Sequence, residues 1–152
     1  MPRSPAPSAA LAGNTPDEVE AQFYEALRRA DLELLMAVWA DDDEIVCVHP
    51  GGPRLVGTAA IRTSFEAIFG NGAVPVRPEQ VHRMQWLGGA LHHLLERIDV
   101  PAEGGGAQSA WVPATNVYVK TAQGWRMAAH HASPSSASQE MPGAGDASAT
   151  LH

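Results

Sequence analysis

The spacing of apolar residues changes from a helical to an alternating pattern about halfway along the chain, and this change constrains the fold most. In the first half, apolar side chains such as Val19 and Phe23 recur at the three- and four-residue intervals of a helix face. From residue 73 onward, alternating segments are separated by turn signals at Gly88–Gly89 and Ala122–Gly124. Helices followed by antiparallel strands predict an α+β fold, in which a curved sheet wraps about three N-terminal helices.

Start and stop signals place these elements along the chain. Thr15 begins the first helix with a capping box that includes Glu18, and Asp31 caps a second, short helix. A third helix begins at Gly57–Thr58 and ends at Gly70. The segments predicted as strands, which give a sheet of roughly four to six strands, are 45–48, 54–56, 73–86, 90–100, 108–121 and 125–132.

Both ends of the chain differ in composition from the middle. Residues 1–14 and 133–152 are rich in small residues and proline and lack apolar periodicity. Such segments bury too little apolar surface to offset the entropy of ordering. We therefore expect two disordered tails around a single domain at residues 15–132, which is long enough to hold one hydrophobic core.

Charge and cysteine content exclude several classes of function. The 152-residue chain has a net charge of −7 and no basic cluster, which argues against binding to nucleic acid or to an anionic membrane. The single cysteine, Cys47, excludes an intramolecular disulfide and a cysteine zinc site. Neither a transmembrane run nor the apolar core of a secretory signal is visible, so we expect a cytoplasmic protein.

Six short segments follow one another in the order of the predicted elements: Phe23–Leu27, Ala30–Leu32, Trp39–Asp42, Gly57–Arg62, Gly124–Met127 and His131–Ser133. Their order and spacing, over about residues 17–133, resemble the nuclear transport factor 2-like (NTF2-like) superfamily. The ketosteroid-isomerase-like and SnoaL-like small proteins are the most similar group. The resemblance implies a cone-shaped α+β barrel, an apolar pocket at its open end, and a homodimer formed through the sheet.

His49 is the first candidate for a catalytic residue. It follows the apolar strand at 45–48 and precedes Pro50. The resemblance implies that this His-Pro pair corresponds to the Asp-Pro pair of ketosteroid isomerases, whose aspartate moves the proton. A histidine titrates near neutral pH and can act there as general base or acid. The alternative is a structural histidine that binds a turn carbonyl at the end of the strand.

Two adjacent histidines lie on the predicted last strand. Because side chains alternate between the two faces of a strand, His130 and His131 cannot both line one pocket. The His-x-Ser resemblance favours His131, which we expect to orient the proton acceptor or relay its proton and to share a face with Trp125 and Met127. The alternative for each histidine is a hydrogen-bonded residue of the sheet or of a dimer interface.

The candidates for the remaining roles depend on the resemblance. Asp42 precedes the buried strand and is a second candidate relay; the alternative is a carboxylate that binds local backbone N–H groups. The oxyanion-binding tyrosine of the isomerases corresponds to Phe23, and their acid falls near Thr115 or Asn116, which cannot ionise. Steroid isomerisation is therefore not expected, and Tyr24 or Asn116 becomes the donor to a developing enolate.

The predicted pocket has aromatic walls: Trp39, Phe69 and Trp111 would suit a flat organic ligand. The chain lacks the helical His-x-x-x-His or Glu-x-x-His spacing of metal sites, so we expect no metal and no cofactor. A metal site would require His49, His131 and an acid among residues 41–43 to converge through the fold.

The resemblance implies a homodimer, and the predicted pocket residues favour a small apolar or aromatic ligand. As an enzyme the protein would be a cofactor-independent isomerase, dehydratase or cyclase that uses general acid–base catalysis. The alternative is a non-catalytic ligand-binding or dimerisation module of the same fold, because the isomerase pattern is incomplete.

Overall fold

The computed structural model describes residues 13–102 and 104–134, so the predicted tails lie almost wholly outside the described residues. The helices are α2 (Pro16–Arg29), α3 (Leu32–Ala37) and α4 (Thr58–Gly70). The strands are β1 (Val46–Val48), β2 (Arg54–Val56), β3 (Val76–Trp86), β4 (Gly89–Pro101), β5 (Ala107–Thr121) and β6 (Gly124–Ala132). The segments with helical and alternating apolar patterns therefore form helices and strands close to the predicted bounds.

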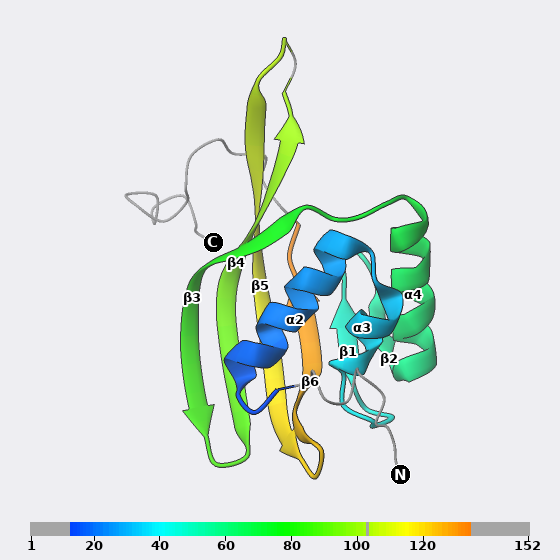
Figure 1. Cartoon of the computed structure of the whole chain (residues 1–152), viewed down its shortest axis with the longest axis vertical. Helices are drawn as coiled ribbons and strands as arrows, with labels where there is room; N and C mark the ends of the chain where they lie inside the picture. The colour runs from blue at the N-terminus through cyan, green and yellow to red at the C-terminus, as the bar shows by residue number, and fades with distance from the viewer. Residues whose placement is uncertain (1–12, 103, 135–152) are drawn as a thin grey trace, which may run out of the picture.

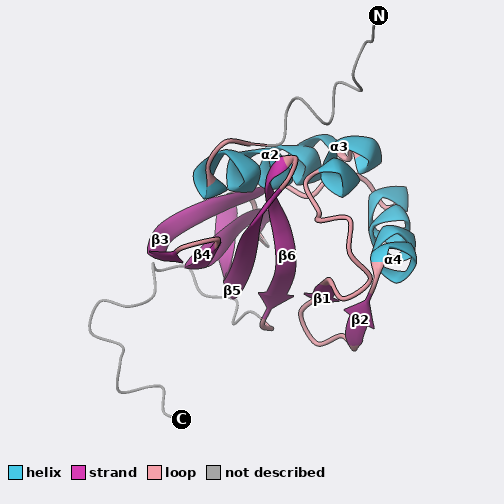
Figure 2. Ribbon diagram, turned by 90° about the horizontal axis from the view of Figure 1, so that it is seen from below, coloured by secondary structure: helices cyan, strands magenta, loops and turns pink. Residues whose placement is uncertain are grey.

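The six strands form one curved sheet in the order β2-β1-β6-β5-β4-β3. Strands β1 and β6 run parallel, and the other neighbours in this sheet are antiparallel. Helix α2 crosses the concave face of the sheet, and α4 lies at the side of β1 and β2 (Figures 1 and 2). The predicted α+β class and mostly antiparallel curved sheet are confirmed; the sheet stays unclosed, with β2 and β3 at its edges.

Side-chain caps fix the ends of the first two helices. The Thr15 hydroxyl accepts from the backbone N–H of Glu18 at 3.1 Å, as the capping box predicts. The Asp31 carboxylate accepts from the backbone N–H of Leu34 at 3.0 Å and starts α3. Ala30 lies between them in the left-handed region (φ 51°) and turns the chain from one helix into the next. None of the described helices has both the length and the apolar character needed to cross a membrane.

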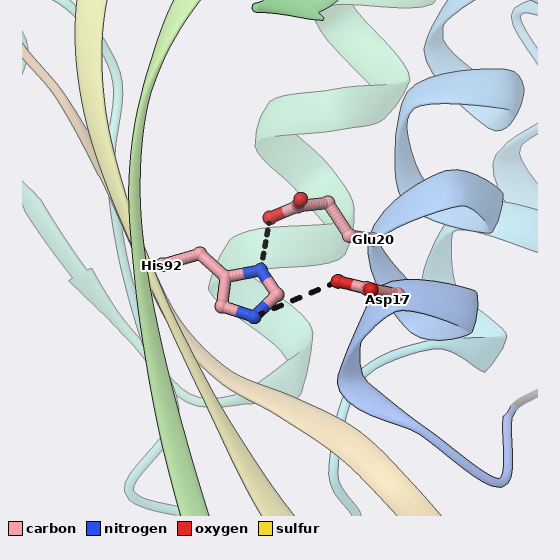
Figure 3. A group of neighbouring side chains, drawn as sticks. All are labelled: Asp17, Glu20 and His92. Carbon is pink, nitrogen blue, oxygen red and sulfur yellow. Dashed lines mark hydrogen bonds and ion pairs between the residues drawn. The ribbon is translucent and has the colours of Figure 1, made fainter. Parts of the chain in front are cut away.

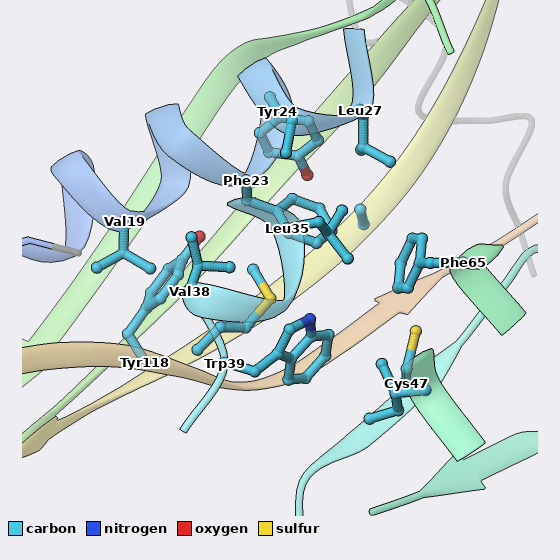
Figure 4. Packing of buried hydrophobic residues seen from close by; sticks show 14 of the residues in the cluster. Val19, Phe23, Tyr24, Leu27, Leu35, Val38, Trp39, Cys47, Phe65 and Tyr118 are labelled. Carbon is cyan, nitrogen blue, oxygen red and sulfur yellow. The ribbon is translucent and has the colours of Figure 1, made fainter. Parts of the chain in front are cut away.

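The hydrophobic core lies between α2 and the concave face of the sheet (Figure 4). Phe23 stands at its centre, with its ring edge-to-face against Tyr24, Trp39 and Phe65 at centroid distances of 5.0, 6.5 and 6.2 Å. Truncating such a fully buried aromatic ring typically costs about 3–5 kcal/mol of stability. This packing holds α2 over the interior residues of β4, β5 and β6.

A β-bulge changes the alternation of side chains in the last strand. Ala128 has no residue opposite it on β5, because the register shifts there. The inner face therefore passes from Met127 to His130, which is buried, whereas His131 is exposed on the outer face. The expectation that Met127 and His131 share a face is wrong for this reason.

Candidate active site

A cavity of about 160 Å³ lies inside the fold, among α2, α4, the end of β1 and the inner face of the sheet. Its walls are mainly apolar: Leu27, Pro50, Phe65, Ile68, Val74, Val76, Ile98, Val112 and Ala132. Three titratable side chains, those of His49, Glu96 and His130, interrupt this lining. Titratable groups in an apolar cavity are the usual marks of a site that moves protons.

Glu96 contributes a carboxyl group from the middle of β4. It is buried, and its Oε2 atom accepts a hydrogen bond from the Tyr24 hydroxyl at 2.7 Å. Burial raises the pKa of Glu96 to about 7, and the negative charge of Glu20 adds to this rise, while the Tyr24 hydrogen bond opposes it. The carboxyl group therefore carries its proton up to neutral pH, where it can donate it.

His130 faces Glu96 from the neighbouring part of the sheet. Its Nδ1 atom lies 2.6 Å from the amide oxygen of Asn116, and its Nε2 atom lies 3.7 Å from Oε2 of Glu96. Burial, followed by the charges of His49 and His131, lowers the pKa of His130 to about 3. Because an amide oxygen only accepts, the neutral ring carries its proton on Nδ1, and Nε2 is left as an acceptor toward Glu96.

His49 lies at the end of β1, against α4. Its Nε2 atom is 3.0 Å from the Ser64 hydroxyl, which donates its own proton to the carbonyl of Ile61 at 2.8 Å. The neutral His49 ring must therefore donate from Nε2, so that Nδ1 is the basic nitrogen. Burial lowers the pKa of His49, and the ring packs edge-to-face on Phe65 at 4.9 Å. The residue is thus a neutral base at ordinary pH.

Tyr24 and Asn116, the predicted donors, stand behind the cavity rather than in its lining. The Asn116 amide donates to the Tyr24 hydroxyl at 3.1 Å, and that hydroxyl donates to Glu96. Both residues are fully buried. Burial, followed by the negative charge of Glu96, raises the pKa of Tyr24, so that it stays a phenol. Their hydrogen atoms are engaged in supporting Glu96 and are not directed at a ligand.

The structure separates the other predicted residues from this cavity. Asp42 is exposed, and its carboxylate accepts from the backbone N–H of Glu44 at 2.8 Å. His131 lies on the outer face, as described above. Of the candidates for catalysis and enolate binding, the fold therefore brings together His49, Tyr24 and Asn116 and leaves Asp42 and His131 outside.

The predicted aromatic walls also lie elsewhere. Trp39 packs in the core beside Phe23, and Phe69 packs on Phe65 at 6.1 Å on the outer part of α4. Trp111 lies on the face of β5 opposite to the cavity, with the Arg97 guanidinium 5.9 Å from its ring centre. None of the three lines the interior cavity, whose walls are mostly aliphatic.

A second titratable cluster lies at the start of α2, where His92 stands between Glu20 and Asp17 (Figure 3). His92 Nδ1 is 2.9 Å from Glu20, and Nε2 is 3.8 Å from Asp17. These three residues have the spacing of a metal site. Asp17, however, already binds the Arg83 guanidinium at 2.8 Å, and Glu20 accepts from the Tyr118 hydroxyl at 2.7 Å. Asp17 thus already has a cationic partner, and the Glu20 oxygen already has hydrogen-bond donors. These contacts favour an ion-pair network over a bound metal.

Sequence reasoning missed Glu96, Glu20 and the inward side of the His130–His131 pair. Glu96 shares the inward phase of β4 with His92 and Leu94, and Glu20 precedes Tyr24 by one helical turn. The signal that identifies such residues is a carboxylate at a position where the spacing of a helix or strand predicts a buried apolar side chain. The bulge that selects His130 depends on the pairing of β5 and β6, which no local pattern reveals.

The three helices and the curved, unclosed sheet are those of a class of small α+β cone proteins. The chain matches the SnoaL-like domain over residues 17–137 and belongs to this family, within the NTF2-like superfamily. The predicted superfamily is therefore confirmed. None of the functionally curated proteins is similar enough to the chain to count as a match.

Solved structures agree with this assignment. A provisionally assigned calcium/calmodulin-dependent protein kinase type II association domain from Thiobacillus denitrificans is 35% identical, with a TM-score of 0.71 over 79% of this chain and 94% of that one. A provisionally assigned dehydratase of the NTF2-like family from Streptomyces avermitilis is 31% identical, with a TM-score of 0.67 over 79% and 98%. A ketosteroid isomerase-like protein from Erwinia carotovora atroseptica, 19% identical with a TM-score of 0.61 over 84% and 95%, shares the fold.

Proposed function

We propose that the chain is a cofactor-independent enzyme that catalyses proton transfer on a small, neutral organic molecule with a carbonyl group. The observation that carries this proposal is the presence of a protonated carboxyl group, Glu96, and two neutral imidazoles in the lining of one apolar cavity. Such a set can supply one proton and remove another at neutral pH.

In this mechanism, His49 is the general base and Glu96 the general acid. His49 removes a proton from the carbon next to the carbonyl group through Nδ1, and Glu96 donates to the oxygen as negative charge develops there. Return of the proton to a different carbon gives an isomerisation. For a dehydration, the enol oxygen returns its proton to Glu96 as the carbonyl group re-forms, and Glu96 passes that proton to a β-hydroxyl group, which leaves as water. The 31% identity to a provisionally assigned dehydratase supports the same reaction class.

The lining of the cavity also restricts the ligand. No arginine or lysine lies among the residues that line it, so an anionic ligand would find no counter-ion. The aliphatic walls favour an apolar body, and a volume of about 160 Å³ restricts it to a small molecule. A small cyclic ketone has this size and polarity and makes a suitable probe.

The experiment is hydrogen–deuterium exchange at the α-carbons of cyclohexanone in D₂O, followed by NMR. We expect the wild-type protein to accelerate exchange above the buffer rate, and His49→Ala to lower this acceleration about 10²- to 10⁴-fold, which is the range for loss of a general base. His131→Ala, on the outer face, is the matched control. Equal rates for the wild type and His49→Ala would refute the proposal.

A second proposal, homodimerisation through the outer face of the sheet, rests on a different observation. A groove of about 400 Å³ crosses this face, and the residues that line it include Val46, His93, Pro113, Thr115, Val117, Ala129, His131 and Ser133. Met84 and Trp86 on β3 are 54% and 49% exposed. A broad, partly apolar face of this kind is typical of an association surface. The 35% identical relative is named as an association domain, which supports a self-associating module as the alternative function.

A further inference from the structure

Asn116 connects two buried carboxyl groups from opposite sides of the interior. Its Nδ2 atom lies 3.4 Å from Oε2 of Glu20 and 3.1 Å from the Tyr24 hydroxyl, which donates to Glu96. Its Oδ1 atom lies 2.6 Å from Nδ1 of His130. Glu20 does not line the cavity, but hydrogen bonds through Asn116 and Tyr24 connect it to His130 and Glu96, which do.

The carboxylate of Glu20 determines which way the Asn116 amide points. Its Oε2 atom is also approached by the Tyr118 hydroxyl at 2.7 Å and by Nδ1 of His92 at 2.9 Å, a set of donors that suits a carboxylate. An ionised carboxylate only accepts hydrogen bonds. Asn116 must therefore present its NH₂ group to Glu20 and its oxygen to His130.

The orientation of the Asn116 amide fixes the direction of two further hydrogen bonds. The Asn116 oxygen requires a proton on Nδ1 of His130, so the other nitrogen, Nε2, faces Glu96 without a proton. The Asn116 NH₂ group donates to Tyr24, so the single phenolic proton must go to Glu96. The hydrogen bond from Tyr24 favours the carboxylate form of Glu96, whereas the unprotonated Nε2 of His130 on the cavity side favours the protonated acid.

We propose that Glu20 is a positioning residue that acts through Asn116 to hold Nε2 of His130 as a hydrogen-bond acceptor beside Glu96, the proton donor of the cavity. The inference rests on the proposed function. The charge of Glu20 acts in the same sense, because it raises the pKa of Glu96. The titratable groups around Glu96 are Tyr24 and Glu20 from α2, His130 from β6, Cys47 from β1 and, in the lining of the same cavity, His49 at the end of β1.

The test is Glu20→Gln, an isosteric change that lets an NH₂ group replace the acceptor. That NH₂ group can donate to the Asn116 oxygen, so the Asn116 amide turns and His130 moves its proton to Nε2. We expect imidazole ¹⁵N shifts to report a proton on Nδ1 in the wild type and on Nε2 in the variant. The ¹³C titration midpoint of the Glu96 carboxyl should fall in the same variant.

Tyr118→Phe is the matched control, because it removes a hydrogen bond from Glu20 and keeps the carboxylate. We expect it to retain the wild-type proton on Nδ1 of His130. A proton on Nε2 in the wild type, or an unchanged His130 and Glu96 in Glu20→Gln, would overturn the inference. If Glu20→Gln does not fold, the wild-type spectrum still tests the orientation of Asn116, because a proton on Nε2 of His130 would overturn the inference.

These readouts need no turnover, so they separate this inference from the proposed function. A switch of the His130 proton without any cyclohexanone exchange would refute the enzyme and leave the role of Glu20 intact. Exchange by a protein whose His130 proton does not respond to Glu20 would refute the role of Glu20 alone.

Discussion

Nε2 of His130 lies 3.7 Å from Oε2 of Glu96, with both atoms at the wall of the interior cavity. This separation is longer than a hydrogen bond, so neither group satisfies the other. Each is instead oriented from behind, His130 by Asn116 and Glu96 by Tyr24. A small ligand with one polar end would therefore meet a fixed acceptor, Nε2 of His130, and a fixed donor, the carboxyl group of Glu96, that are not bonded to each other.

Glu96→Gln should change how stability depends on pH. The pKa of Glu96 is raised from 4.5 to about 7 in the folded protein, so between these values the folded state binds more protons than the unfolded state. Wild-type stability should therefore fall, relative to Glu96→Gln, as the pH rises from about 5 to about 8, by on the order of 2–3 kcal/mol. Urea unfolding of both proteins across this range measures the difference; a difference that stays constant would contradict the protonated Glu96.

His130→Ala and His131→Ala form a matched pair on one strand. His130→Ala should reduce cyclohexanone exchange about 10-fold, the effect of one lost hydrogen-bond acceptor beside Glu96, and destabilise the fold by about 1–3 kcal/mol, because the Asn116 oxygen loses its donor. His131→Ala, at an exposed site, should change stability by less than about 0.5 kcal/mol and keep the exchange rate. Exchange assays and urea unfolding check both, and a larger loss of exchange in His131→Ala would contradict the inward assignment of His130.

Val117→Lys should weaken self-association, because it puts a charge into the groove on the outer face of the sheet. Native mass spectrometry should show a wild-type dimer and a largely monomeric variant. Glu66→Lys, on the exposed surface of α4, is the control and should remain a dimer. A monomeric wild type would argue against association through this face.

Thr15→Ala should destabilise the domain by about 1 kcal/mol, because the backbone N–H of Glu18 loses its side-chain acceptor at the start of α2. Asn14→Ala is the control, since Asn14 contacts Glu18 only through its backbone N–H among the bonds described here. Urea unfolding should show the loss for Thr15→Ala alone; equal losses in both variants would contradict the assigned cap.

Local chemistry was enough to predict most elements of the fold. The helix caps, the glycine turns and the change of apolar period depend on residues close together in the chain, and α2, α4 and the strands lie near their predicted bounds. The site was less predictable, because its groups come from α2, β1, β4, β5 and β6. The resemblance to ketosteroid isomerases pointed to Tyr24, His49 and Asn116, whereas no residue of that family's pattern corresponds to Glu96.

The choice between His130 and His131 shows where local reasoning stops. Strict alternation from Met127 predicts His131 on the inner face, and one unpaired residue, Ala128, reverses that outcome. The roles of Asn116 and Tyr24 likewise depend on which donors and acceptors meet them from other strands. Hydrogen-bond direction in a buried network is a property of the assembled fold.

The measurement that tests the central claim most directly is the pH dependence of cyclohexanone exchange in the wild type and in Glu96→Gln. With Glu96 as the acid, the enzyme-catalysed rate should fall as the pH rises through about 7, and Glu96→Gln should give a low rate without this fall. A wild-type rate that keeps rising through this range, or the same profile in Glu96→Gln, would contradict acid catalysis by Glu96.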